Sequence, residues 1–176
     1  MAERPRGLFV MLEGADGSGK STIADHLVPA LRSAGHTVRR IARSQPTGDP
    51  LHADLVRAVD QLFRAPDATA PGWEFLSLAA AAQYHSILYA QVAPRVQDGE
   101  VVIAESWWDK TWIRLGLEPE TCRRLDMHAT RQLRAWQRDL LPPSPLPHHQ
   151  HLTILIDTPQ PDRVNWYKAA DCPDPV

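Results

Sequence analysis

The amino-acid sequence predicts an α/β fold in which helices cover both faces of a parallel β-sheet. Three observations predict it: short apolar runs, amphipathic helical stretches between them, and a glycine-rich loop directly after the first apolar run. Strands that are continuous apolar runs and alternate with helices are typical of parallel sheets buried on both faces. In such folds ligands bind at the carboxyl ends of the strands, where the glycine-rich loop lies.

Predicted strands and helices follow one another along the chain. Short apolar, β-prone runs predict strands at 8–13, 37–42, 101–104 and 152–157. Apolar residues at helical spacing predict helices at 21–34, 51–63, 73–96 and 121–140. Pro94 is expected to kink or close the third of these helices. The residues expected to face inward in the last helix include Leu125, His128, Leu133 and Trp136.

Composition narrows the class of protein. The chain has 176 residues, 43% of them hydrophobic, which suits one domain with a real core. A formal net charge of −2 offers no basic footprint for nucleic acid. Residues 1–7 lack the apolar core of a signal peptide, and no run approaches the roughly 18 apolar residues of a membrane span. Two cysteines without metal-type spacing favour a reducing compartment, so we expect a cytoplasmic protein. From the charge and the lack of a long apolar run, we expect binding to neither nucleic acid nor membrane.

The strongest motif is the loop at residues 14–21. Its letters, GADGSGKS, fit GxxxxGK[ST] without a mismatch, between a predicted strand and a predicted helix. Glycines allow positive φ, so backbone N–H groups can turn toward an anion, and the following helix adds its N-terminal dipole. We expect Lys20 to reach the β- and γ-phosphates of ATP and Ser21 to bind Mg²⁺. The expected cofactor-binding residues are Gly14, Ala15, Asp16, Gly17, Ser18, Gly19, Lys20, Ser21 and Thr22.

The stretch FVMLEGADGSGKSTIADHLVPALRSAGHTV resembles the start of a thymidylate kinase. Glu13 and Asp16 occupy the two acidic positions of that family's motif. Pro94, Gly99, the run VVIA and the run LTILID with Asp157 extend the resemblance to about residue 165. The resemblance implies a three-layer P-loop kinase fold, one domain over residues 1–176, and an ATP- and Mg²⁺-dependent nucleotide kinase.

The resemblance also implies roles for individual residues. Lys20 would neutralise developing charge, Asp16 would contact the sugar hydroxyl of the acceptor, and Arg57 would orient the acceptor phosphate. Glu105 would hold Mg²⁺ together with Ser21. The turn SQPTGDP, which contains Pro46, matches a turn of the family's acceptor site. Each of these residues also has a bland reading, as a helix cap, an ion pair or a solvated side chain, and the sequence leaves it open.

The acceptor pocket departs from the family. The family's long-helix arginine and stacking phenylalanine correspond to Tyr84 and Ala80 here, and its Asp-Arg pair corresponds to Glu105 and Ser106. A phosphoryl-transfer site needs cations around the migrating group, so lost arginines put transfer to plain thymidylate in doubt. Glu13 is an expected substrate-binding residue, and the side chains that could surround a base are Trp73, Gln83, Tyr84, Trp107, Trp108 and Trp112. Lys110 and Arg114 could restore the lost positive charge. Each aromatic could equally be a core residue.

Three functions follow from these observations. The first is phosphoryl transfer to a nucleoside monophosphate or nucleotide-like acceptor; the alternatives are a deoxynucleoside kinase and an ATP-binding regulatory module without transfer activity. The family's arginine-rich lid would begin near Arg163 and Lys168. Because the sequence ends soon afterwards, at Val176, the lid and the last strand are expected to be short or missing. The resemblance also implies a homodimer, for which the alanine-rich helix at 76–90 is the expected contact surface. We expect no chemistry from Cys122, or from His148, His149 and His151, which lie in a proline-rich loop.

Overall fold

A parallel sheet forms the centre of the molecule. The computed structural model describes residues 7–41, 50–64, 73–108, 128, 131–132, 135–136, 139–140 and 146–158. Within these ranges the strands are β1 (Leu8–Glu13), β2 (Val38–Ile41), β3 (Val101–Glu105) and β4 (His151–Leu155). Their order is β2-β3-β1-β4, and every pairing is parallel. The predicted parallel sheet is therefore confirmed, with β1 and its glycine-rich loop between two neighbours.

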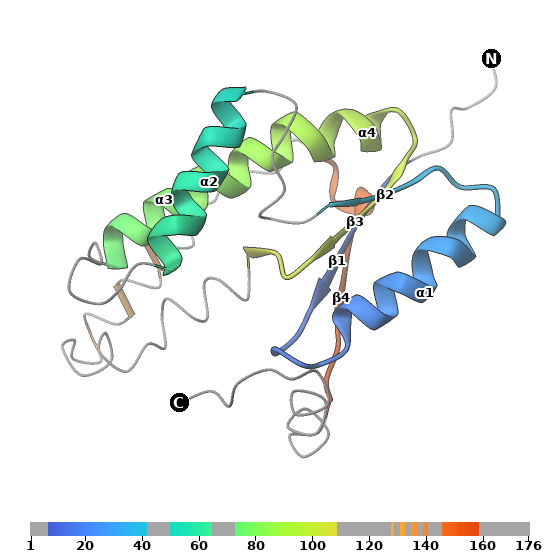
Figure 1. Cartoon of the computed structure of the whole chain (residues 1–176), viewed down its shortest axis with the longest axis horizontal. Helices are drawn as coiled ribbons and strands as arrows, with labels where there is room; N and C mark the ends of the chain where they lie inside the picture. Colours follow the sequence, from blue (N-terminus) through green and yellow to red (C-terminus); the bar gives the residue numbers. More distant parts are fainter. Residues whose placement is uncertain are drawn as a thin grey trace.

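Helices lie on both faces of this sheet. They are α1 (Lys20–Ser33), α2 (Pro50–Arg64), α3 (Trp73–Ile87), the π-helix η2 (Leu88–Val92) and α4 (Ala93–Gln97). Figure 1 shows α1 on one side of the strands and α3 with α4 on the other. The three-layer α/β architecture predicted from the sequence is confirmed.

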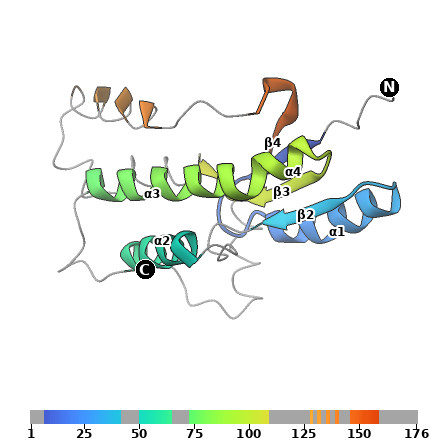
Figure 2. The same cartoon turned by 90° about the horizontal axis from the view of Figure 1, so that it is seen from above.

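The long helix opposite α1 changes its hydrogen-bond spacing before Pro94. Figure 2 shows α3 and α4 running on as one rod, with η2 between them. Proline has no N–H to donate to the carbonyl one turn earlier, and a π-type turn is a common way to absorb such a defect. The helix thus continues past Pro94 to Gln97 instead of closing there.

Two hydrophobic clusters flank the sheet, because successive side chains of a strand point to opposite faces. Phe9 and Val102 pack against α3, η2 and α4 on one face. Val10 and Ile103 pack against α1 on the other. We call these the α3 face and the α1 face. A residue at the end of β1 or β3 can therefore be assigned to a face by its position in the strand.

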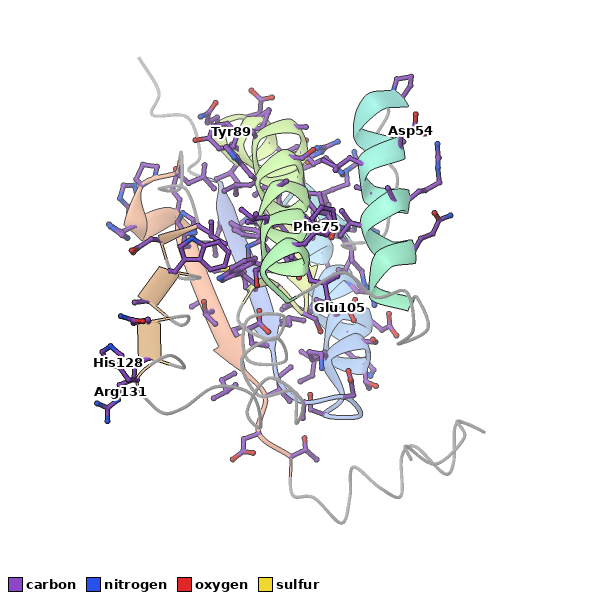
Figure 3. The ribbon with its side chains drawn as sticks, turned by 90° about the vertical axis from the view of Figure 1, so that its left-hand side faces the viewer. Asp54, Phe75, Tyr89, Glu105, His128 and Arg131 are labelled. Carbon is purple, nitrogen blue, oxygen red and sulfur yellow. The ribbon has the colours of Figure 1, made fainter. Side chains whose placement is uncertain are left out.

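Some residues that were expected to be buried are exposed in the structure. β4 lies at the edge of the sheet, and the side chains of Leu152 and Leu155 are 45% and 74% exposed. His128 and Trp136 were expected to face inward, but both are exposed, and Figure 3 places His128 at the rim of the molecule. Leu125 and Leu133 lie outside the described residues. Among the helices that are described, none is long and apolar enough to cross a membrane.

Candidate active site

The glycine-rich loop has the backbone shape that the motif predicts. Gly14, Gly17 and Gly19 all have positive φ, at 150°, 72° and 89°. A Cβ atom on Gly14 would lie 2.6 Å from the carbonyl oxygen of Ile156 and 2.7 Å from Ser18 Oγ. Only glycine fits this position without displacing the backbone beside it. The loop leads directly into α1, so the unpaired backbone N–H groups at the start of that helix lie at the end of the loop.

The end of β4 holds the loop from the side. The Ile156 N–H donates to the Glu13 carbonyl over 2.8 Å, which extends the β1–β4 pairing by one step. The Thr158 hydroxyl donates to the Ser18 carbonyl over 2.9 Å. Segments 140 residues apart in the sequence thus fix the position of one short loop. Thr158 was not singled out from the sequence, and nothing local to it indicates this role.

Lys20 lies inside the loop. Its side chain is buried, and Nζ donates to the carbonyls of Gly14 at 2.8 Å and Ala15 at 2.6 Å. A buried ammonium needs such oxygen partners to offset the loss of water. The ammonium is therefore positioned inside the loop whose backbone N–H groups, in this motif, surround phosphate oxygens. Asp16 and Thr22 are exposed at the loop and at the start of α1.

Ser21 and Glu105 meet on the α1 face. Residues 101, 103 and 105 of β3 share that face, and Ser21 lies in the first turn of α1. The Ser21 hydroxyl donates to Glu105 Oε2 over 2.6 Å. A hydroxyl and a carboxylate are hard oxygen ligands of the kind Mg²⁺ prefers, and Mg²⁺ beside a nucleotide takes only one or two protein ligands. The pair fits that ion, even though the described residues contain no cluster of three or more His, Cys, Asp or Glu side chains for a metal.

Arg40 on β2 joins this pair and was missed by the sequence analysis. Its guanidinium forms an ion pair with Glu105 and another, at 2.5 Å, with Asp25 of α1. Burial alone would lower the pKa of Arg40, but the hydrogen bonds and charges of Asp25 and Glu105 outweigh it and raise that pKa. The sequence contained part of the signal, because strand periodicity places Arg40 on the same face as Val38, which is the α1 face. The sequence did not show that β2 lies next to β3, which is what brings Arg40 to Glu105.

On the α3 face the expected acceptor residues are buried and linked to one another. The backbone N–H of Trp107 donates to Glu13 Oε1 at 2.7 Å, and the Tyr84 hydroxyl donates to the backbone carbonyl of Trp107 at 3.1 Å. The ring of Tyr84 packs edge-to-face on Trp107 and Trp108, with centroids 4.9 Å and 5.4 Å apart. Tyr84 and Gln83 are each 1% exposed. The structure thus brings Glu13, Tyr84 and Trp107 together, as part of the core beside the loop.

Arg57 lies apart from these groups. It forms an ion pair with Asp54 on the same helix, and both side chains are more than half exposed. Figure 3 shows Asp54 on the outer side of α2, well away from Glu105.

Several other residues singled out from the sequence are not among those that the structure describes. Pro46, Lys110, Trp112, Arg114, Cys122, Arg163 and Lys168 lie outside the described residues, and the side chain of Trp73 does as well. His148 and His149 are exposed, and a ring nitrogen of His151 lies 3.3 Å from the Leu146 carbonyl.

One residue between the two faces has an unusual backbone. Ser106 follows Glu105 with a φ of 55°, and its N–H donates to the Leu12 carbonyl at 2.9 Å. Strand periodicity would place residues 105 and 107 on the same face. The left-handed turn at Ser106 instead leaves Glu105 on the α1 face and sends Trp107 into the cluster on the α3 face. This turn therefore separates the Ser21–Glu105 pair from the aromatic side chains of Tyr84, Trp107 and Trp108.

Comparison with known proteins points to one family. No family model matches the chain. The chain is 38% identical to the thymidylate kinase of Ruegeria pomeroyi over 125 residues, 70% of this chain and 56% of that enzyme. It is 32% identical to the Geobacter sulfurreducens thymidylate kinase over 157 residues, 87% of this chain and 64% of that enzyme. It therefore spans less than two thirds of either of these two relatives.

A third relative is matched over more of its length. The thymidylate kinase of Bordetella petrii is 32% identical over 170 residues, 94% of this chain and 76% of that enzyme. The fold agrees with the crystal structure of thymidylate kinase from Ehrlichia chaffeensis, with a TM-score of 0.60, 20% identity, and coverage of 94% of this chain and 84% of that one. Sequence similarity at this level and coverage assigns the chain: it belongs to the thymidylate kinase family.

Proposed function

We propose that this protein transfers a phosphoryl group from ATP, with Mg²⁺, to a nucleoside monophosphate or a nucleotide-like acceptor. The single observation that carries the proposal is the pairing of Ser21 with Glu105 at 2.6 Å, directly beside a glycine-rich loop that encloses Lys20. The relatives named above are thymidylate kinases, which supports the same reaction class.

The phosphate end of the reaction would use groups of the loop. The amides at the start of α1 and the Lys20 ammonium would bind the β- and γ-phosphates, with Lys20 exchanging the carbonyls of Gly14 and Ala15 for phosphate oxygens, which are charged and form stronger hydrogen bonds. Ser21 and Glu105 would hold Mg²⁺, which supplies charge neutralisation on the phosphates when bound. Phosphoryl transfer depends mainly on such positioning and electrostatics.

The acceptor end is less richly charged. Asp16 is exposed at the loop, and we expect it to contact a sugar hydroxyl of the acceptor. Tyr84, Gln83 and Trp107 are buried, so they could contact a base only if their side chains shifted. Otherwise exposed atoms of neighbouring residues would make that contact. Arg57 would reach an acceptor only after leaving Asp54, a surface ion pair of a kind that costs about 0–1 kcal/mol to break. The proposal therefore covers nucleotide-like acceptors in general and does not commit to thymidylate.

The test is ADP production from ATP and Mg²⁺ against a panel of nucleoside monophosphates and deoxynucleosides. We expect one acceptor to stimulate turnover and Lys20→Ala to abolish both turnover and ATP binding. Arg39→Ala is a suitable control, because Arg39 is an exposed cation on β2. A Lys20→Ala protein that binds ATP as well as the wild type would refute the assignment of the loop.

Two alternatives give different results in the same assay. A deoxynucleoside kinase would respond to deoxynucleosides and ignore monophosphates. An ATP-binding regulatory module would bind ATP and show slow turnover that no acceptor stimulates. The loss of the family's arginines at Tyr84 and Ser106 favours the module, whereas the intact loop and Asp16 favour the enzyme.

We also propose that the protein forms a homodimer in the cytoplasm through the long helix opposite α1. Phe75, Leu78 and Tyr89 are 52%, 50% and 46% exposed along this helix, and Figure 3 labels Phe75 and Tyr89 on it. Large apolar side chains gathered on one element are typical of an interaction surface. Sedimentation at micromolar concentration should give a dimer that Leu78→Glu converts to a monomer. A monomeric wild type would contradict the proposal.

A further inference from the structure

We infer that Arg40, together with Asp25, is a positioning device that directs one oxygen of Glu105 toward Ser21 and so builds the Mg²⁺ site. This inference rests on the proposed function, because it concerns the metal that would accompany ATP. Arg40 is not part of the phosphate-loop motif. It lies on β2, and its partners come from β3 and α1.

The two oxygens of Glu105 have different partners. Oε1 accepts from the Arg40 guanidinium, and Oε2 accepts from the Ser21 hydroxyl over 2.6 Å. A guanidinium is planar with donors in a fixed fork, so it can hold two carboxylates at once in a defined geometry. With Oε1 held by Arg40, Oε2 is the oxygen that remains beside Ser21 for a cation.

Asp25 completes the arrangement from α1. Ser21 and Asp25 are four residues apart in one helix, so they lie on the same side of α1, one turn from each other. Asp25 pairs with Arg40 at 2.5 Å, and its side chain is 64% exposed, whereas the Glu105 side chain is 18% exposed. Asp25 therefore anchors the solvent side of the guanidinium while Glu105 receives the inner side.

A glutamate needs this help more than an aspartate. Its carboxylate lies one methylene further from the backbone and has one more rotatable bond to order, which costs free energy when a metal binds. The Arg40 contact holds that bond before the metal arrives. Groups that orient a metal ligand in this way typically contribute 10- to 100-fold to metal affinity or activity.

In the alternative explanation, Arg40 acts only through its positive charge and does not orient Glu105. A cation beside the site would repel Mg²⁺ and attract triphosphate, so removing it would strengthen the effect of Mg²⁺ and weaken metal-free binding. Positioning predicts the reverse: removing Arg40 should weaken binding in the presence of Mg²⁺ and leave metal-free binding nearly unchanged. The two readings differ in sign.

The experiment measures the dissociation constant of a non-hydrolysable ATP analogue by calorimetry, once with saturating Mg²⁺ and once with EDTA. The quantity compared is the factor by which Mg²⁺ tightens binding. We expect this factor to fall about tenfold in Arg40→Met and to stay at the wild-type value in Arg39→Met, the same change at the next residue of the same strand. In the Glu105→Ala background, Arg40→Met should cause no further fall, because the oxygen that Arg40 positions is gone.

Other outcomes separate the inference from the proposed function. A wild type whose affinity for the analogue does not depend on Mg²⁺ would overturn the metal site and this inference together. A Mg²⁺-dependent wild type with an unchanged or larger factor in Arg40→Met would overturn the inference alone. If Arg40→Met melts too low to be measured, Asp25→Asn serves instead, since it loosens Arg40 at an exposed position. We expect a smaller fall of the same sign there, and an unchanged factor would count against the device.

Discussion

The two faces of the sheet differ sharply at the carboxyl ends of the strands. On the α1 face, Ser21, Arg40 and Glu105 form a chain of charge-assisted contacts with partial access to water. On the α3 face, Tyr84 and Trp107 fill the equivalent place with aromatic rings that are at most 8% exposed. Both groups lie next to the same loop.

This difference teaches where binding and where stability reside. Partly hydrated polar side chains can exchange their present partners for a cation or a phosphate at little cost. Buried aromatic rings cannot be withdrawn without leaving a cavity. Substitutions on the α1 face should therefore reduce nucleotide or metal binding, whereas substitutions on the α3 face should reduce the free energy of unfolding.

Tyr84 offers the largest expected effect and can break this comparison. Tyr84→Ala should lower the free energy of unfolding by about 3–5 kcal/mol, because it removes a ring packed on Trp107 and Trp108. Tyr84→Phe should cost about 1 kcal/mol, the contribution of one hydrogen bond, here to the Trp107 carbonyl. Denaturant unfolding measures both. A Tyr84→Phe protein of wild-type stability with a raised KM for the acceptor would instead place Tyr84 in the acceptor site.

Gly14 tests the loop that both faces share. Gly14→Ala should destabilise the fold by about 1–3 kcal/mol through overpacking against Ile156 and Ser18, and should weaken ATP binding at least tenfold. Gly35→Ala is the matched control. Its φ of 89° is also unfavourable for alanine, at roughly 1–2 kcal/mol, but no atom lies within 4 Å of the added Cβ. We expect ATP affinity to survive in Gly35→Ala, and equal loss of affinity in both variants would refute the steric explanation.

Ser106 gives the smallest effect and sharpens the comparison at the point where the faces divide. Ser106→Val should lower the free energy of unfolding by about 1–2 kcal/mol, because a β-branched residue tolerates a φ of 55° poorly. Ser106→Gly should be close to neutral, since relief of strain and the extra chain entropy of glycine oppose each other. Urea denaturation of the two variants gives the difference. Wild-type stability in Ser106→Val would mean that the left-handed turn is not required.

Much of the fold could be predicted from local patterns. The run LFVMLE forms β1 with the predicted bounds, and α1 begins at Lys20, one residue before the predicted start. Strand and helix periodicities are local properties, set by backbone sterics and by which side chains must leave water. The same reasoning failed at His128, which is exposed, because an apolar pattern in the sequence does not show which distant parts of the chain cover a side chain.

The candidate site was predicted unevenly for the same reason. Gly14 to Ser21 are contiguous, so one motif contains their chemistry. The resemblance to a family implied that Ser21 and Glu105 both hold Mg²⁺, which stays a prediction; the structure brings the two side chains within 2.6 Å of each other. Arg40 was missed because its relation to Glu105 depends on β2 lying next to β3, which no local pattern reports.

By itself, the sequence determined the glycine-rich loop, the parallel α/β class and the residue types available to the site, because short-range sterics and hydrophobic periodicity encode them. Only the tertiary structure decided which side chains meet. Strand order brought Arg40 to Glu105, and the turn at Ser106 placed Trp107 and Glu105 on opposite faces. These outcomes depend on contacts between residues far apart in the chain, where packing and charge pairing select one arrangement among many that local preferences allow.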